Sequence, residues 1–193
     1  YLQQIWYRFM GTDGQYPADY TAFINGYYPA NALVPGWSYE KSAESEFLPA
    51  SGTGSYLVTD QANITYVNVA RKAYRIVYNG NGADFGSVDP QSAYCGQVLD
   101  LRKNRFARQG AEFLGWSKTP DGEIIKSSGV KNLSLTDGAV VTLYAKWKLL
   151  PYKITLDNQG ANKSGGTRAV YECFSKGYYK NKEMTQVFAK GRI

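Results

Sequence analysis

Alternation of apolar and polar side chains is clearest in the run Tyr-Arg-Ile-Val-Tyr that starts at residue 74. Tyr74, Ile76 and Tyr78 recur at every second position, which places them on one face of an extended strand. The run Asn79–Gly82 follows directly, and its alternating Asn and Gly residues are typical of a tight turn. The pattern therefore predicts a strand that enters a hairpin.

Further strands are predicted in the second half of the chain. Residues 112–116 and 140–147 are rich in aromatic and β-branched side chains, which favour strands. Between them, residues 119–122 (Thr-Pro-Asp-Gly) have the composition of a turn. Residues 98–101 (Val-Leu-Asp-Leu) are either the end of a strand or a short helical turn. No amphipathic pattern longer than about two helical turns is present, so the fold class is expected to be mainly β to α+β.

The same pattern returns 78 residues later. Residues 74–83 align with residues 152–161 without a gap, because 152 − 74 = 78. Other pairs share this offset or differ from it by one residue: Tyr66 with Tyr144, Cys95 with Cys173, and Gly36-Trp37 with Gly115-Trp116. Self-similarity at a fixed period indicates a tandem array of repeats.

The period divides the chain into three predicted units: residues 1–70, residues 71–150 and an incomplete third unit, residues 151–193. The connections at 70–73 and 148–151 are short and lack a Gly/Ser-rich tract, so neighbouring units should keep a restricted orientation. After the second connection only 193 − 151 = 42 residues remain, too few to fill a core alone. We expect this unit to lean on a neighbour, to fray, or to be completed by sequence outside the segment.

Charge changes this picture little. The chain has 22 Lys and Arg against 16 Asp and Glu, a net charge of +6, which favours anionic partners only weakly. The tightest basic cluster is Arg102, Lys103, Arg105 and Arg108. It is either a solvated face or a patch that binds wall polymers, sulfated glycans or nucleic acid. Because no RNP-type motif or recognition helix is present, nucleic acid is not an expected partner.

Metal and thiol chemistry are disfavoured by the residue types. The chain has two cysteines and no histidine, so neither a four-ligand zinc site nor an imidazole-activated thiol is expected. Cys95 and Cys173 occupy equivalent positions of consecutive units, about one unit length apart, and we therefore expect no disulfide between them. Acidic residues are scattered without the spacing of a calcium loop.

Matches to catalytic motifs are weak. Ser38 and Lys41 have the Ser-x-x-Lys spacing of penicillin-binding enzymes, but the companion motifs are absent. A short polar loop cannot hold two of its glutamates (Glu40, Glu44, Glu46) at a fixed spacing around a sugar. The loop at 79–82 is followed by no Lys-Ser/Thr, so it is not a phosphate cradle. The sequence therefore predicts no enzyme, no cofactor and no metal.

Three motifs of the predicted second unit carry a family resemblance. They are Tyr-Arg-Ile-Val-Tyr-Asn-Gly-Asn-Gly at 74–82, Arg-Gln-Gly-Ala-Glu-Phe-Leu-Gly-Trp at 108–116 and Val-Thr-Leu-Tyr-Ala-Lys-Trp at 141–147. Together they resemble the Listeria–Bacteroides repeat, the B-repeat of internalin-like bacterial surface proteins. Ala111 departs from the pattern, since the family often has an aromatic residue there.

The resemblance extends, more loosely, to the flanking units. Residues 154–161 and 169–172 look like the first half of another such repeat, without its Gly-Trp and closing strand. Residues 5–9, 36–37 and 64–67 are similar to the mucin-binding-like relatives of the repeat. The resemblance implies tandem small β-grasp (ubiquitin-like) repeats arranged as an elongated rod, with at most one short helix.

The resemblance also implies a function outside the cell. Members of the family are not known for catalysis and serve as stalks and as adhesion or receptor-contact modules. We therefore expect a bacterial cell-surface or secreted spacer whose partners are neighbouring repeats and a host or cell-surface protein or glycan. Any leader or wall anchor is expected outside this segment, because the chain starts Tyr-Leu-Gln-Gln. No membrane insertion is expected, because no run approaches about 20 apolar residues.

Candidate site residues follow from these interpretations. Landmark aromatics of the repeat are predicted to anchor cores: Trp37, Trp116, Tyr144 and Trp147. The alternative function is binding of carbohydrate or wall polymer through the basic cluster 102–108 together with exposed tyrosines, above all Tyr27 and Tyr28. Tyr offers an apolar face and a hydroxyl to a sugar, and the further candidates for such stacking are Tyr16, Tyr20, Tyr178 and Tyr179.

Overall fold

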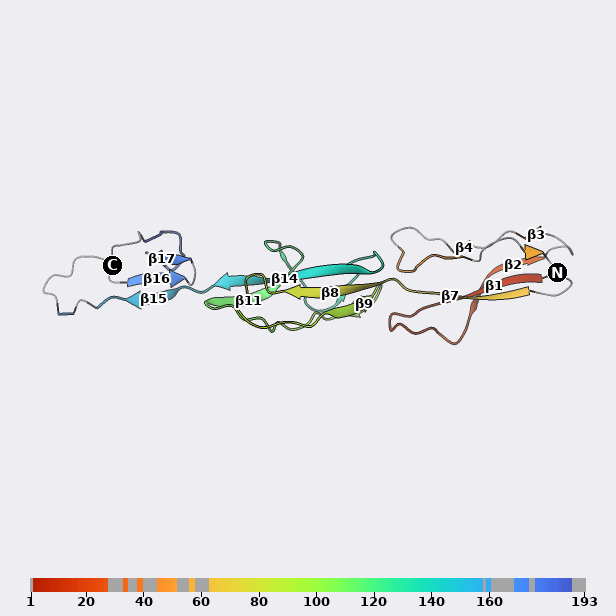
Figure 1. Ribbon diagram of the computed structural model, residues 1–193, viewed down its shortest axis with the longest axis horizontal. Helices are drawn as coiled ribbons and strands as arrows, with labels where there is room; N and C mark the ends of the chain where they lie inside the picture. The colour runs from red at the N-terminus through yellow and green to blue at the C-terminus, as the bar shows by residue number, and fades with distance from the viewer. Residues whose placement is uncertain are drawn as a thin grey trace. The chain divides into compact units, whose positions relative to one another are not determined.

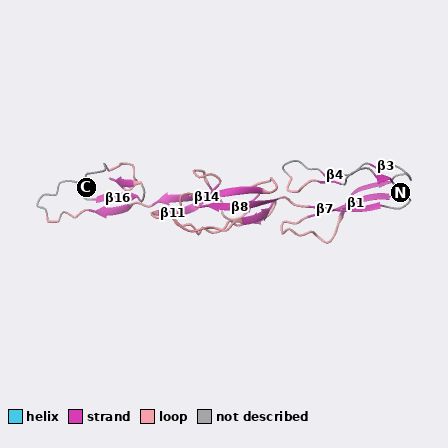
Figure 2. Cartoon of the chain, viewed as in Figure 1, coloured by secondary structure: helices cyan, strands magenta, loops and turns pink. Residues whose placement is uncertain are grey.

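The computed structural model describes residues 2–27, 33–34, 38–39, 45–51, 56–57, 63–157, 159–160, 169–173 and 176–188. Every regular element within these ranges is a β-strand (Figures 1 and 2). The expectation of a mainly β chain is therefore confirmed. No helix in the described ranges has the length and apolar character needed to cross a membrane.

The chain divides into two compact units, and both are discontinuous in sequence. The first comprises Tyr1–Val77, Pro90–Arg102 and Ser127–Thr142; the second comprises Tyr78–Asp89, Lys103–Lys126 and Leu143–Ile193. This division cuts within the predicted repeat 71–150. The predicted ends of that repeat, at residues 70 and 150, stay a prediction.

A three-stranded sheet forms the start of the first unit, in the order β2-β1-β7. Strand β1 (Leu2–Phe9) pairs antiparallel with β2 (Thr21–Tyr27) and parallel with β7 (Asn63–Val69). Alternate residues Tyr7, Val67 and Val69 are buried together, and Phe9 and Phe47 pack against them. Side chains that alternate along a strand point to opposite faces, so this sheet has one face in the core and one face outside it.

A five-stranded sheet follows in the order β12-β11-β14-β8-β9. In β8 (Ala73–Asn79) the side chains of Tyr74, Ile76 and Tyr78 are buried, as the alternation predicts. The other strands are β9 (Gln91–Tyr94), β11 (Ala111–Ser117), β12 (Ile124–Ile125) and β14 (Ala139–Leu149). The strands predicted at 112–116 and 140–147 are thus confirmed. The turn predicted at 119–122 is confirmed by a bond from the Gly122 N–H to the Thr119 carbonyl (3.1 Å).

Smaller sheets complete the fold. Residues 98–101, left open between a strand and a helical turn, contain strand β10 (Val98–Leu99), which pairs with β13 (Val130–Lys131). In the second unit β15 (Tyr152–Thr155), β16 (Ala169–Cys173) and β17 (Gly177–Tyr179) form an antiparallel sheet. Two pairs of short strands lie in the first unit: β3 (Leu33–Val34) with β6 (Tyr56–Leu57), and β4 (Ser38–Tyr39) with β5 (Ala50–Ser51).

The Gly-Trp motif of the second unit has a structural basis. The register between β11 and β14 shifts between Phe113 and Gly115, as in a β-bulge. A Cβ atom at Gly115 would lie 2.5 Å from Cγ2 of Ile124, so a larger residue does not fit there without a shift of that side chain. The next residue, Trp116, is only 1% exposed and packs against Tyr78 and Phe113, with ring centroids 4.7 and 5.0 Å away.

The remaining predicted anchors lie in different surroundings. Trp147 is half-buried; its indole N–H donates to the Gly80 carbonyl at 2.8 Å, and its ring meets Phe113 edge-on. Tyr144 is half-buried in β14. Trp37 lies outside the described residues.

Candidate functional site

The predicted basic cluster is divided between the two compact units. Arg102 belongs to the first unit, whereas Lys103, Arg105 and Arg108 belong to the second. The side chains of Arg102, Lys103 and Arg105 are exposed. Arg108 is half-buried, and its Nη1 donates to the Asn81 carbonyl at 3.5 Å. Arg108 thus has a structural contact, while the exposed members stay candidates for anion binding.

The tyrosines predicted to stack on sugars differ in their surroundings. Tyr27 ends strand β2, but its side chain, like the whole of Tyr28, lies outside the described residues. Tyr178 and Tyr179 are half-buried in β17, and the Tyr179 hydroxyl donates to the Lys176 carbonyl (3.4 Å). The rings of the two others, Tyr16 and Tyr20, are both in contact with one arginine guanidinium in the first unit.

The residues considered for catalysis are buried, bonded within the protein, or outside the described ranges. Cys95 and Cys173 are both free and buried, and burial raises the pKa of the Cys95 thiol, which disfavours the reactive thiolate. Glu40, Lys41 and Glu44 lie outside the described residues. Where the structure is described, no three His, Cys, Asp or Glu side chains gather as a metal site would require.

Hydrogen bonds of Asn81 hold the loop after β8 in place. Its side-chain amide donates to the carbonyls of Pro120 and Ala145, both at 2.9 Å, and its own backbone N–H bonds to the Asn79 side chain. One residue thereby ties the loop, the turn at 119–122 and strand β14 together. This agrees with the interpretation of Asn79–Gly82 as a turn.

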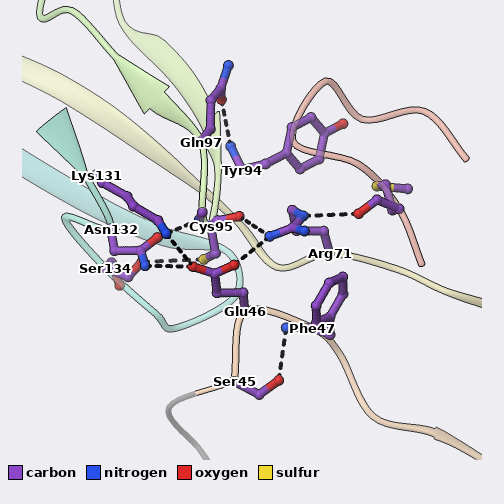
Figure 3. A network of polar contacts seen from close by, with 12 residues as sticks. Ser45, Glu46, Phe47, Arg71, Tyr94, Cys95, Gln97, Lys131, Asn132 and Ser134 are labelled. Atoms are coloured by element: carbon purple, nitrogen blue, oxygen red, sulfur yellow. Dashed lines mark hydrogen bonds and ion pairs between the residues drawn. The ribbon is translucent and has the colours of Figure 1, made fainter. Parts of the chain in front are cut away.

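An extensive polar network surrounds Arg71, in the predicted connection at 70–73 (Figure 3). Its Nε donates to the Met10 carbonyl at 3.0 Å, and its Nη1 donates to the Cys95 carbonyl at 2.7 Å. The same Nη1 forms an ion pair with Oε2 of Glu46, also at 2.7 Å. The Arg71 side chain is only 10% exposed, and a charge so far from water needs partners of this kind.

Glu46 lies between Arg71 on one side and Lys131 and Asn132 on the other (Figure 3). Its Oε1 accepts from the Asn132 side-chain amide at 2.9 Å and lies 3.3 Å from Nζ of Lys131. The bond from Asn132, with those from Arg71 and Lys131, lowers the pKa of the Glu46 carboxyl against the opposing effect of its partial burial. The carboxylate is therefore held in its charged form, where its bonds are strongest.

Gly96 is also part of the network. Its backbone N–H donates to Oδ1 of Asn132 at 2.5 Å, and its φ of +85° belongs to the left-handed region that favours glycine. A Cβ atom here would lie 2.5 Å from Nη1 of Arg71 and would meet Oε2 of Glu46 even more closely. A larger residue would therefore force the paired side chains of Arg71 and Glu46 to shift.

Backbone and aromatic contacts reinforce the same connection. Phe47 and Arg71 form an antiparallel bridge, flanked by bonds from Leu48 N–H to the Ala70 carbonyl and from Lys72 N–H to the Glu46 carbonyl (both 2.9 Å). The Arg71 guanidinium also lies over the Phe47 ring, 4.3 Å from its centroid. The connection is thus paired along its backbone and not only through side chains.

Residues of this network are not among the site residues that the sequence predicts. The sequence places Arg71 only in a short linker, and Glu46 only in a polar loop. A charged residue inside a short connection between two strands is the available signal, because such a position brings it close to several backbone carbonyls. No protein-family model matches the chain, and no curated protein matches it either.

Proposed function

We propose that this chain is a non-catalytic spacer module of a bacterial cell-surface or secreted protein, built of tandem β-grasp repeats in an elongated rod. Its partners are neighbouring repeats and a host or cell-surface protein or glycan. The proposal is supported by the 78-residue period, by the motif resemblance, and by the mainly β fold of the described residues.

The observation that carries the proposal is the network around Arg71. A spacer must resist bending at its connections, and a short linker without fixed contacts would act as a hinge. Here Arg71 of the connection at 70–73 is bonded, within the first compact unit, to the Met10 and Cys95 carbonyls and to the Glu46 carboxylate. The buried Arg71 guanidinium contacts these carbonyls, the Glu46 carboxylate and the Phe47 ring, and each contact holds the backbone of the connection in place.

The experiment is an epitope-exposure assay. The chain is placed between a wall-anchored domain and a peptide epitope, and antibody binding to intact bacteria is compared with that of a Gly/Ser linker of equal length. A stiff spacer should expose the epitope more fully than the flexible linker, and Arg71→Ala should reduce the exposure while Arg75→Ala, at an exposed site, leaves it unchanged. Equal exposure for spacer and linker would reject the proposal.

Binding of wall polymer is the second candidate function. What favours it is that Lys103 and Arg105 are exposed and that no ion pair involving either is found in the described part of the chain. Contacts with polyanions weaken as salt screens them. Binding to purified cell walls should therefore fall at high salt and in the double variant Lys103→Ala/Arg105→Ala. The exposed pair Lys118→Ala/Lys126→Ala is the matched control, and equal loss in both double variants would reject a specific basic site.

A further inference from the structure

The first sheet carries an aromatic and polar surface on the face opposite to its core. Tyr7 and Val67 are buried, so the next residues along the strands, Arg8 and Asn68, lie on the other face together with Tyr66. Arg8 stands directly beside Asn68 in the parallel register of β1 and β7. This face therefore brings a large ring, a guanidinium and an amide together.

The Arg8 guanidinium lies over two tyrosine rings. Its guanidinium carbon lies 5.3 Å from the ring centroid of Tyr16 and 4.7 Å from that of Tyr20. Its Nε donates to Oδ1 of Asn68 at 2.6 Å, and its Nη1 donates to the Pro17 carbonyl at 3.2 Å. The charge is thus engaged within the protein, which makes Arg8 a positioning residue for its neighbours.

Asn68 and Tyr66 are left facing solvent. Oδ1 of Asn68 also accepts from the Tyr20 hydroxyl at 3.1 Å, so this oxygen accepts two hydrogen bonds. The NH₂ group of the amide is the part that can donate to a ligand. The Tyr66 ring packs against Tyr20 at 61°, with centroids 4.9 Å apart, yet Tyr66 is 61% exposed. A ring that is fixed by a neighbour but open to water loses little side-chain freedom when a ligand arrives.

We propose that Tyr66 and Asn68 bind a neutral pyranose sugar on the outer face of the first sheet. The apolar C–H face of the sugar stacks on the Tyr66 ring, and the Asn68 amide and the Tyr66 hydroxyl exchange hydrogen bonds with the sugar's hydroxyl groups. A neutral sugar is favoured because Arg8, a cation of this face, already has partners within the protein. This site uses none of the basic residues of the wall-polymer candidate and does not depend on the spacer role.

Saturation-transfer NMR on the full chain tests the proposal. The probes are methyl β-galactopyranoside, methyl β-glucopyranoside and methyl N-acetyl-β-glucosaminide, with a sulfated heparin disaccharide as the anionic comparison. At least one neutral probe should bind weakly, and its binding should shift the amide signals of residues 66–68. Tyr66→Ala should weaken this binding by about tenfold, the loss of one stacking contact. Tyr152→Ala, which removes a tyrosine of similar exposure (54%) from β15, should leave it unchanged.

Three outcomes overturn the proposal. Absence of binding for all three neutral probes at millimolar concentration removes the site. Binding of the sulfated disaccharide alone means that charge, not stacking, selects the ligand. Equal losses in Tyr66→Ala and Tyr152→Ala mean that the sugars contact the surface without a specific site. Unchanged amide signals of the buried Tyr7 and Val69 in Tyr66→Ala show that the fold is retained.

Discussion

The two short connections look equivalent in sequence but are fixed differently. At 70–73 the Arg71 side chain joins two backbone carbonyls and a carboxylate, and the backbone is paired on the Phe47 side. At 148–151 the Leu150 side chain is 39% exposed, and the Leu150 N–H bonds to the Gly110 carbonyl at 2.8 Å. Equal linker length therefore does not mean equal fixation. A buried charge adds side-chain contacts to the backbone pairing of the first connection, whereas Lys148 and Leu149 of the second are paired with β11 through the backbone.

The largest effect is expected from Arg71→Ala. The substitution removes three hydrogen bonds and leaves the Glu46 carboxylate with a weaker set of partners, so the free energy of unfolding should fall by about 3 kcal/mol. Urea unfolding measures the change. Arg75→Ala, which truncates an exposed arginine of β8, should change it by less than about 0.5 kcal/mol. Similar losses in both variants would show that Arg71 has no special role.

Gly96→Ala should have the next largest effect, about 2 kcal/mol, because it combines left-handed backbone strain with a clash. Gly138→Ala separates the two causes, since Gly138 has a φ of +70° but a methyl group added there would meet no atom within 4 Å. Thermal unfolding of both variants should therefore show the smaller loss for Gly138→Ala. An equal loss would mean that strain alone, and not the approach to the ion pair, requires glycine at 96.

Glu46→Gln should lower the free energy of unfolding by about 1 kcal/mol at neutral pH. It should also make this free energy fall less steeply as the pH is lowered. Because the Glu46 pKa is lower in the folded chain than its ordinary value of 4.5, the carboxylate stabilises the fold above that pH. This contribution is lost as pH falls through the lowered pKa. Unfolding free energies measured from pH 7 down to pH 3 test this, and an unchanged slope in Glu46→Gln would contradict it.

The smallest effect is expected in the second connection. Leu150→Ala keeps the backbone bond to Gly110 and removes only a partly exposed side chain, so its cost should stay below about 0.5 kcal/mol. Urea unfolding under the conditions used for Arg71→Ala gives the direct contrast. A loss as large as that of Arg71→Ala would abolish the distinction between the two connections.

The strands could be predicted from the sequence because their pattern is local. The alternation of Tyr74, Ile76 and Tyr78, and the aromatic runs of β11 and β14, appear within a few residues of chain. Mainly β architecture follows from them. Whether each predicted repeat is a β-grasp unit depends on pairings between distant segments, which a local pattern does not specify.

The two candidate sites could not be predicted for a related reason. Glu46 reaches Arg71 across 25 residues and Asn132 across 86 residues, and no spacing rule links such positions. Alternation along β7 places Tyr66 and Val67 on opposite faces of the sheet. It does not reveal that the rings of Tyr16 and Tyr20 contact the Arg8 guanidinium. Long-range side-chain contacts, rather than secondary structure, decide both sites.

Residual dipolar couplings test the central claim, that the Arg71 network fixes the connection at 70–73, most directly. The amides of β1 and β7 are compared with those of β8 and β9 in one aligned sample of the full chain. A single alignment tensor should fit all four strands in the unmodified chain, and two different tensors should be needed for Arg71→Ala. Two tensors already required for the unmodified chain would contradict the claim.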